Sequence, residues 1–267
     1  VRHMLGLEAE SGRTVLDVRY DRNDPAAFGL AIHRAALFDA IFQAAMTRPI
    51  QLEQASKIKG INQDADGATL YIDGAGSAGP FDLVIDATGV NSPLSPLRSV
   101  ALPYGAIWGT VDWPDTDLPR DHLSQRYRRA DRMIGALPIG TLPGEATQKA
   151  AIFWSLPRDA HANWQTTGLN HWKDEAITLW PDFAPFIDQI TDPAQMTMAN
   201  YSHGTLRRPF DRRLVHIGDA AHRTSPQLGQ GANMALLDAM ALARALADRP
   251  LNSALPAYAR ARRWHVG

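Results

Sequence analysis

Residues 218–233 read GDAAHRTSPQLGQGAN, and this segment decides the fold. It follows the apolar run LVHI at 214–217, which is typical of a strand, and it leads into an apolar helical pattern over 234–246. Small residues let a ligand lie against the backbone, and a helix start offers free N–H groups at the positive end of its dipole. Asp219, at the carboxyl end of the strand, can accept hydrogen bonds from hydroxyls, as an acidic residue does on a ribose in dinucleotide folds. The segment therefore predicts an anion-binding corner.

This corner closely resembles the second FAD-binding motif of the flavoprotein aromatic hydroxylases, which have the fold of para-hydroxybenzoate hydroxylase. In that family a Gly-Asp-Ala-Ala-His sequence is followed by proline and then by Gly-Gln-Gly-Ala-Asn. The resemblance implies that Asp219 holds the ribityl chain of FAD and that later residues line the flavin ring. The cofactor-binding residues implied here are Gly218, Asp219, Pro226, Gly229, Gly231, Ala232 and Asn233. The alternative is an ordinary strand–loop–helix corner with a capping aspartate.

A second implied cofactor contact is Arg34. A helix is predicted over residues 32–46, because apolar residues recur at helical spacing over 37–45. Arg34 lies on or beside the predicted inward face, where a charge requires a partner. In the hydroxylases an arginine just before such a helix contacts FAD, and the resemblance implies the same role for Arg34. The alternative is a surface arginine at the start of a helix.

A third motif follows the apolar run at 81–85, where the chain reads DATGVNS over residues 86–92. It resembles the middle motif of the family, in which a strand ends in Ala-Asp-Gly before an Asn-Ser or His-Ser pair. Thr88 replaces the family's aspartate, so the backbone role of Gly89 can be retained but the carboxylate role cannot. Because related reductases and halogenases also have a small or hydroxyl residue there, Thr88 and Gly89 favour FAD binding more than hydroxylation. The alternative is a plain turn after a strand.

Residues 101–200 differ in character from the rest of the chain. Aromatic strand-like runs at 107–113, 132–139 and 150–156 are separated by turns rich in Pro and Gly, which predicts one antiparallel sheet. In the family this region is the substrate domain, and its sheet lines an aromatic pocket beside the flavin. The candidate pocket residues are Trp108, Trp113, Phe153 and Trp154, with a place in the hydrophobic core as the alternative for each.

The expected fold is therefore α/β (α+β): a doubly wound FAD-binding domain with an inserted antiparallel-sheet substrate domain. We assign residues 1–100 and 201–267 to a partial FAD-binding domain and 101–200 to the substrate domain. A protein of this kind is expected to open with a βαβ unit that carries Gly-x-Gly-x-x-Gly. No such fingerprint lies near residue 1. The alternatives are a fragment, omitted parts of the chain, or a departure from the family.

Composition bounds the function further. The 267 residues carry a net charge of −1 and are 45% hydrophobic, which is ordinary for a soluble protein and does not indicate a nucleic-acid or membrane-surface partner. The absence of cysteine excludes disulfides, Cys-based metal sites and a Cys nucleophile, and it fits a cytoplasmic protein. No apolar run approaches the roughly 18 residues of a membrane span. The nine histidines show no metal-ligand spacing, so no metal is expected.

The resemblance implies an FAD-dependent monooxygenase that hydroxylates a small aromatic or polyketide-like substrate with O₂. NAD(P)H would reduce FAD, and the oxygen would pass to the substrate through a flavin C4a-hydroperoxide. No catalytic residue is assigned, because the cofactor carries the hard chemistry and the place of His222 in its motif implies a structural hydrogen-bonding role. The alternatives are a non-hydroxylating FAD oxidoreductase, either a reductase or a halogenase, and a truncated non-catalytic fragment. Scarce lysine disfavours the halogenase.

Overall fold

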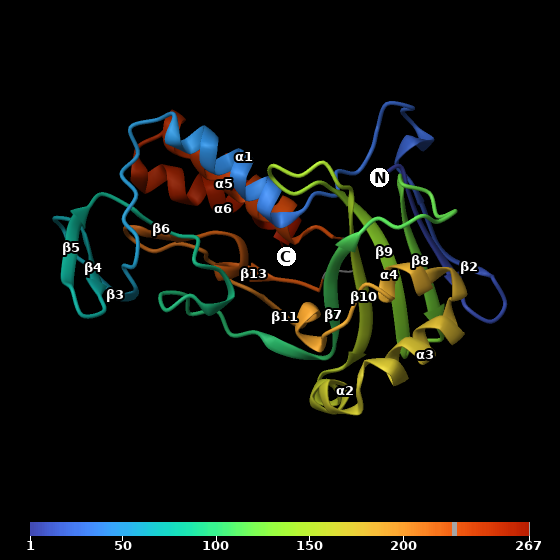
Figure 1. The fold of residues 1–267 in the computed structure, drawn as a ribbon. Helices are drawn as coiled ribbons and strands as arrows, with labels where there is room; N and C mark the ends of the chain where they lie inside the picture. The colour runs from blue at the N-terminus through green and yellow to red at the C-terminus, as the bar shows by residue number, and fades with distance from the viewer. Residues whose placement is uncertain (226–228, 267) are drawn as a thin grey trace. The chain divides into compact units, whose positions relative to one another are not determined.

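The computed structural model describes residues 1–225 and 229–266. The chain divides into two compact units, each built from two separate segments (Figure 1). Val1–Ile50 and Pro103–Asn200 form the first unit, and Gln51–Leu102 and Tyr201–Gly267 form the second.

The first unit is built on a sheet in which the strand order is β7-β10-β9-β8-β1-β2, with β11 next to β7 (Figure 1). All pairs from β7 to β2 are antiparallel except β1 with β8, which is parallel. The strands are β1 (His3–Glu8), β2 (Thr14–Arg19), β7 (Val100–Asp112), β8 (His122–Arg128), β9 (Arg132–Gly140), β10 (Lys149–Pro157) and β11 (Thr197–Thr205). The sheet predicted from the three aromatic runs is therefore confirmed in β7, β9 and β10.

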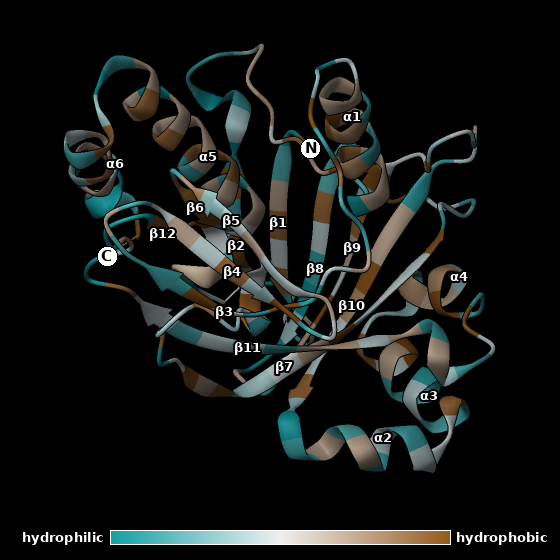
Figure 2. Ribbon diagram, turned by 90° about the vertical axis from the view of Figure 1, so that its left-hand side faces the viewer, coloured by the Kyte–Doolittle hydropathy of each residue, from teal (hydrophilic) through white to brown (hydrophobic). Residues whose placement is uncertain are grey.

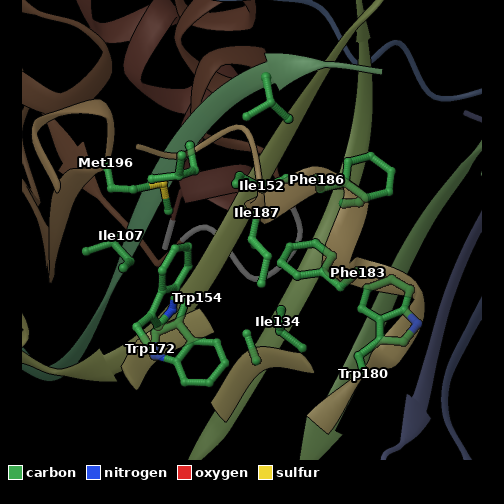
Figure 3. Packing of buried hydrophobic residues seen from close by; sticks show 14 of the residues in the cluster. Ile107, Ile134, Ile152, Trp154, Trp172, Trp180, Phe183, Phe186, Ile187 and Met196 are labelled. Carbon is green, nitrogen blue, oxygen red and sulfur yellow. The ribbon is translucent and has the colours of Figure 1, made fainter. Parts of the chain in front are cut away.

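Strand periodicity explains how this sheet is covered. Successive side chains of a strand point to opposite faces, and in β1 the buried Met4 and Gly6 alternate with the partly exposed His3 and Leu5; Figure 2 colours the strands by hydropathy. One face packs against α2 (His161–Thr167), α3 (Leu169–Leu179) and α4 (Ala184–Ile187). This core contains Trp154 and Trp172 in an edge-to-face contact, and Phe183 and Phe186 stacked (Figure 3). Burial of each such large side chain stabilises the unit by about 1.5–3 kcal/mol.

Residues 1–50 belong to this unit because their strands join its sheet. His3 pairs with His122, and the β1–β2 hairpin extends the sheet from there. The predicted boundary, by contrast, placed residues 1–100 together in the cofactor-binding part. The structure groups 1–50 with the middle region instead, while the division of roles into cofactor and substrate domains stays a prediction. The short 3₁₀ turn Tyr20–Arg22 ends the hairpin.

The second unit contains two small sheets. The first is an antiparallel meander of β3 (Ile58–Gln63), β4 (Ala68–Ile72) and β5 (Gly76–Phe81). The other is a parallel pair, β6 (Val84–Asp86) with β12 (Leu214–His216). Because both strands of a parallel pair end at the same edge, the loops at 86–92 and 217–225 leave the sheet side by side. This edge is where ligands bind in open α/β sheets.

Two helices, α5 (Gly231–Asp248) and α6 (Leu251–Val266), pack on each other and on β12 around Val215, Leu242 and Tyr258. The apolar pattern predicts that α5 is buried nearly all round. That prediction is wrong: Asp238, Leu242 and Ala245 are buried, but Met240 is 67% exposed. Among the described residues, none of the helices combines the length and apolarity needed to cross a membrane.

Candidate functional site

The Gly218–Ala220 segment is a 3₁₀ turn directly after β12. Gly218 has φ +58°, a left-handed conformation that glycine adopts without a steric cost. A Cβ there would lie 3.2 Å from Cβ of Ala235, so the turn also sits close against α5. Asp219 is exposed, and no residue in 1–225 or 229–266 donates a hydrogen bond to its carboxylate. The carboxylate is therefore available to hydroxyl donors of a ligand.

Asp86 organises the neighbouring strand end. Its side chain is fully buried and accepts hydrogen bonds from the hydroxyls of Thr88 and Ser92, both at 2.5 Å. His216 Nδ1 lies 2.7 Å from Asp86 Oδ2 and joins β12 to β6. Burial alone raises the pKa of the Asp86 carboxyl, but the hydrogen bonds from His216, Ser92 and Thr88 outweigh it and hold that pKa well below its ordinary value. Asp86 therefore stays ionised and fixes the loop at 86–92.

Asp238 on α5 is a second buried carboxylate that accepts several hydrogen bonds. Its Oδ2 accepts from the backbone N–H of Gly218 at 2.9 Å and lies 2.6 Å from Nε2 of His222. Its Oδ1 accepts from Nε of Arg262 on α6 at 2.6 Å. Burial raises the pKa of the Asp238 carboxyl, yet the hydrogen bonds from His222, Arg262 and Gly218 lower it overall. The structural hydrogen-bonding role expected for His222 is confirmed.

The glycines of the predicted motifs border open space. A Cβ placed on Gly89, Gly229 or Gly231 would meet no heavy atom within 4 Å among the described residues, and the first two have φ of +80° and +63°. Backbone at these positions can therefore touch a flat ligand directly. Thr88, by contrast, donates its hydroxyl to Asp86, so its side chain supports the loop.

The N-terminus of α5 belongs to the same unit. The side chain of Gln230 makes no capping hydrogen bond to the backbone of the first turn, which begins with Gly231, Ala232 and Asn233. All three residues are exposed. The first N–H groups of a helix together with its dipole favour negative charge. Pro226, the remaining residue predicted in this motif, lies outside the described residues.

Arg34 does not lie as predicted. It is the first residue of α1 (Arg34–Met46), it is exposed, and α1 has no buried residue. The prediction that Arg34 lies on or beside a buried face of the helix is therefore wrong. Because the guanidinium is exposed, it does not require a charged partner within the protein. His33 caps the helix by accepting from the backbone N–H of Ala35 at 3.1 Å. A cofactor contact by Arg34 stays a prediction.

The four aromatic candidates divide between the two faces of the first unit's sheet. Trp113 and Trp154 lie in the core with the helices, at 8% and 2% exposure. Trp108 and Phe153 are a directly paired cross-strand couple on the opposite face, with ring centroids 4.6 Å apart. The Phe153 ring lies over Gly135, which leaves room for it because it has no side chain. Phe153 is itself only 3% exposed, so three of the four aromatic candidates are buried and Trp108 alone of the four is partly exposed; a place in a substrate pocket stays a prediction.

Sequence reasoning missed three partners in the buried networks: His216, Arg262 and the role of Asp238. A signal existed for the last two. Asp238 interrupts an otherwise apolar helix, and Arg262 sits in a helix that packs on it. Buried charges are almost always paired, so an acid and a base on consecutive helices indicate an ion pair. The short strand containing His216 gave no comparable signal.

A family model described as an FAD binding domain matches residues 17–265. The chain therefore belongs to this family of FAD-binding domains, and the family predicted from residues 218–233 is confirmed.

Two curated relatives are similar to this chain in sequence over most of its length. The chain is 24% identical to 3-hydroxybenzoate 6-hydroxylase of Klebsiella oxytoca, covering 92% of this chain and 63% of the relative. It is 29% identical to kynurenine 3-monooxygenase of Xanthomonas campestris pv. campestris, covering 92% of this chain and 56% of the relative. The chain thus spans 56 to 63% of the length of these relatives.

Two solved structures share the fold. PqsL of Pseudomonas aeruginosa, described as a probable FAD-dependent monooxygenase, matches with a TM-score of 0.81 at 17% identity, over 98% of this chain and 73% of its own. HpxO of Klebsiella pneumoniae, solved with FAD and uric acid, matches with a TM-score of 0.74 at 19% identity, over 97% and 66%. The predicted mixed α/β fold is confirmed by these likenesses.

Proposed function

We propose that this chain forms the FAD-contacting and substrate-contacting parts of an FAD-dependent monooxygenase. The observation that carries the proposal is the turn at 218–222, where the exposed Asp219 carboxylate has no hydrogen-bond donor among the described residues and Asp238 fixes the turn. The family match supports FAD as the ligand. When bound, FAD supplies the redox chemistry by taking electrons from NAD(P)H and activating O₂.

The residues of this chain would bind and orient the cofactor. Asp219 accepts hydrogen bonds from the ribityl hydroxyls, and Gly89, Gly229 and Gly231 allow contact with the ring at backbone distance. The free N–H groups and the dipole at the start of α5 hold negative charge on the ring. Arg34 and Pro226 are further proposed FAD contacts, on the resemblance alone.

The proposed substrate is a small aromatic or heterocyclic molecule. Relatives are named for 3-hydroxybenzoate and kynurenine, and one structural neighbour was solved with uric acid. In this chain Trp108, which is partly exposed and lies in ring contact with the buried Phe153, is the candidate for contact with such a ring. We further propose NADH or NADPH as the reductant and O₂ as the co-substrate. The proposed location is the cytoplasm.

The visible absorption spectrum of the purified chain, before and after addition of FAD, tests the proposal. A flavin band that stays with the protein through gel filtration is the expected result. NAD(P)H oxidation with a panel of aromatic acids then follows, with mass spectrometry of the product for one added oxygen. Failure to retain flavin at any FAD concentration would overturn the proposal for this chain.

A second function is favoured by one observation, the replacement of the family's aspartate by Thr88. A non-hydroxylating FAD oxidoreductase would retain flavin and oxidise NAD(P)H. It would give a reduced product without an added oxygen, so the same assay separates the two functions.

A further inference from the structure

We propose that Asp238 is the positioning residue of the cofactor turn, which we define as residues 218–222. Its carboxylate holds both ends of the turn and so sets the direction of the Asp219 side chain. The inference rests on the proposed function, because it assigns Asp238 to FAD binding. Asp238 itself lies inside the unit at 0% exposure and has no direct access to a ligand.

One oxygen of Asp238 fixes both ends of the turn. Oδ2 accepts from the N–H of Gly218, the first residue, and contacts Nε2 of His222, the last. Between them the turn closes on itself, because the N–H of Ala221 donates to the carbonyl of Gly218 at 2.8 Å. Asp219 is the residue next to the first anchor, so its position follows directly from the Gly218 hydrogen bond.

The other oxygen links the turn to the helices. Oδ1 accepts from Nε of Arg262, whose Nη2 also donates to the carbonyl of Met234 at 3.2 Å. Arg262 is 5% exposed, so the pair is an internal one with little screening by water. The carboxylate thus connects the cofactor turn with α5 and α6 through one group.

A neutral amide cannot replace this carboxylate. Asn at position 238 would offer one acceptor oxygen and a donating NH₂ group, whereas Gly218, His222 and Arg262 all present donors. One side of the network would therefore place donor against donor. Since the substitution is nearly isosteric, its main effect would fall on the hydrogen bonds rather than on the packing of α5.

The test compares Asp238→Asn with Asp248→Asn, a matched control on the same helix. Asp248 is exposed and pairs with Arg244 at the surface. Two quantities are measured: the Kd for FAD, from flavin fluorescence, and amide hydrogen exchange of peptides covering residues 214–224 without FAD. Far-UV circular dichroism at the same temperature verifies that each variant is folded.

We expect Asp238→Asn to raise the Kd for FAD at least tenfold and to speed exchange selectively over 214–224, while Asp248→Asn changes both less than twofold. An unchanged Kd with unchanged exchange would overturn the inference. So would a loss of protection spread evenly over the chain, because that result shows a general structural role. If the wild-type chain does not bind FAD, the proposed function fails, and the exchange measurement alone still decides whether Asp238 holds the turn.

A second pair of variants applies if Asp238→Asn does not fold. His222→Gln keeps an N–H donor toward Asp238, whereas His222→Leu removes it. Weaker FAD binding in His222→Leu, restored at least partly in His222→Gln, is the expected result. Equal Kd values for the two variants would contradict the hydrogen-bonded anchor.

Discussion

On the proposed function, Asp219 is the side chain that we expect to bind FAD most directly. Asp219→Ala removes a charged acceptor worth about 1.5–3 kcal/mol per hydrogen bond. We therefore expect the Kd for FAD to rise roughly 10- to 100-fold, measured by flavin fluorescence. Asp82→Ala, at an exposed position in the same unit, serves as the control and should leave the Kd unchanged. Equal Kd values for the two variants would show that Asp219 does not contact the ribityl chain.

Gly231 tests the position of the flavin ring. A Cβ at Gly231 would meet no heavy atom within 4 Å among the described residues, so we expect Gly231→Val to fold and its side chain to fill the space beside the backbone. We expect loss of flavin retention in gel filtration with an unfolding temperature close to that of the wild type. Ala247→Val, near the other end of α5, provides the control. Normal flavin content in Gly231→Val would mean that the ring lies elsewhere.

Single residues also show where sequence reasoning succeeded. The motif at 218–233 predicted the turn with Asp219 and the helix start after it. Both features depend on residues that are neighbours in the sequence. The Asp238–Arg262 pair was missed, because a pairing between two helices depends on their packing. Thr88 shows the same limit: its identity was read as a lost carboxylate, and only the structure shows the hydroxyl bonded to Asp86.

At the scale of elements, the parallel pair β6–β12 depends on a buried carboxylate at its edge. Asp86 has a pKa lowered from 3.8, so it contributes stability above that ordinary value, and the contribution is lost as the pH falls below it. Asp238 acts in the same direction. We expect the free energy of unfolding to fall steeply below about pH 4, measured by urea unfolding between pH 3 and pH 6.

The variant Asp86→Asn tests whether Asp86 causes this loss of stability at low pH. The variant should be less stable than the wild type at pH 6 and should lose less stability on going to pH 3, because the titrating group is gone. Parallel pH profiles for the two proteins would show that Asp86 does not cause the acid sensitivity.

Elements differ in how well periodicity predicted them. Apolar residues at helical spacing over 171–180 predict a helix with Trp172, Ala176, Leu179 and Trp180 on one face, and the structure buries all four. The glycine-rich residues 74–80 predict a flexible connection, yet Gly76–Phe81 pairs as β5. For α1 and α5 the apolar patterns predicted burial, but α1 has no buried residue and only Asp238, Leu242 and Ala245 of α5 are buried. A periodic pattern identifies an apolar face without showing what covers it.

For the whole molecule, the division into two units gives FAD a selective effect on stability. Six of the seven tryptophans belong to the first unit, and the corner at 218–233 belongs to the second, which contains Trp264. A ligand at a hundredfold excess over its Kd stabilises the state that binds it by about 2.7 kcal/mol. We expect FAD to raise the midpoint of thermal unfolding more in far-UV circular dichroism than in tryptophan fluorescence. Identical shifts would indicate that the units unfold together, and the Asp219→Ala variant should show neither shift.

The pairing of distant segments has a consequence for biosynthesis. His3 of β1 pairs with His122 of β8, and Val84 of β6 pairs with Leu214 of β12. The β1–β2 hairpin must therefore wait on the ribosome until β8 has emerged, and β6 waits still longer for its partner strand. Such non-local contacts form slowly, and unpaired strand edges are prone to aggregation meanwhile. Slower translation between residues 86 and 214 would lengthen that wait, so the yield of folded chain in a cell should depend on codon choice and chaperone supply.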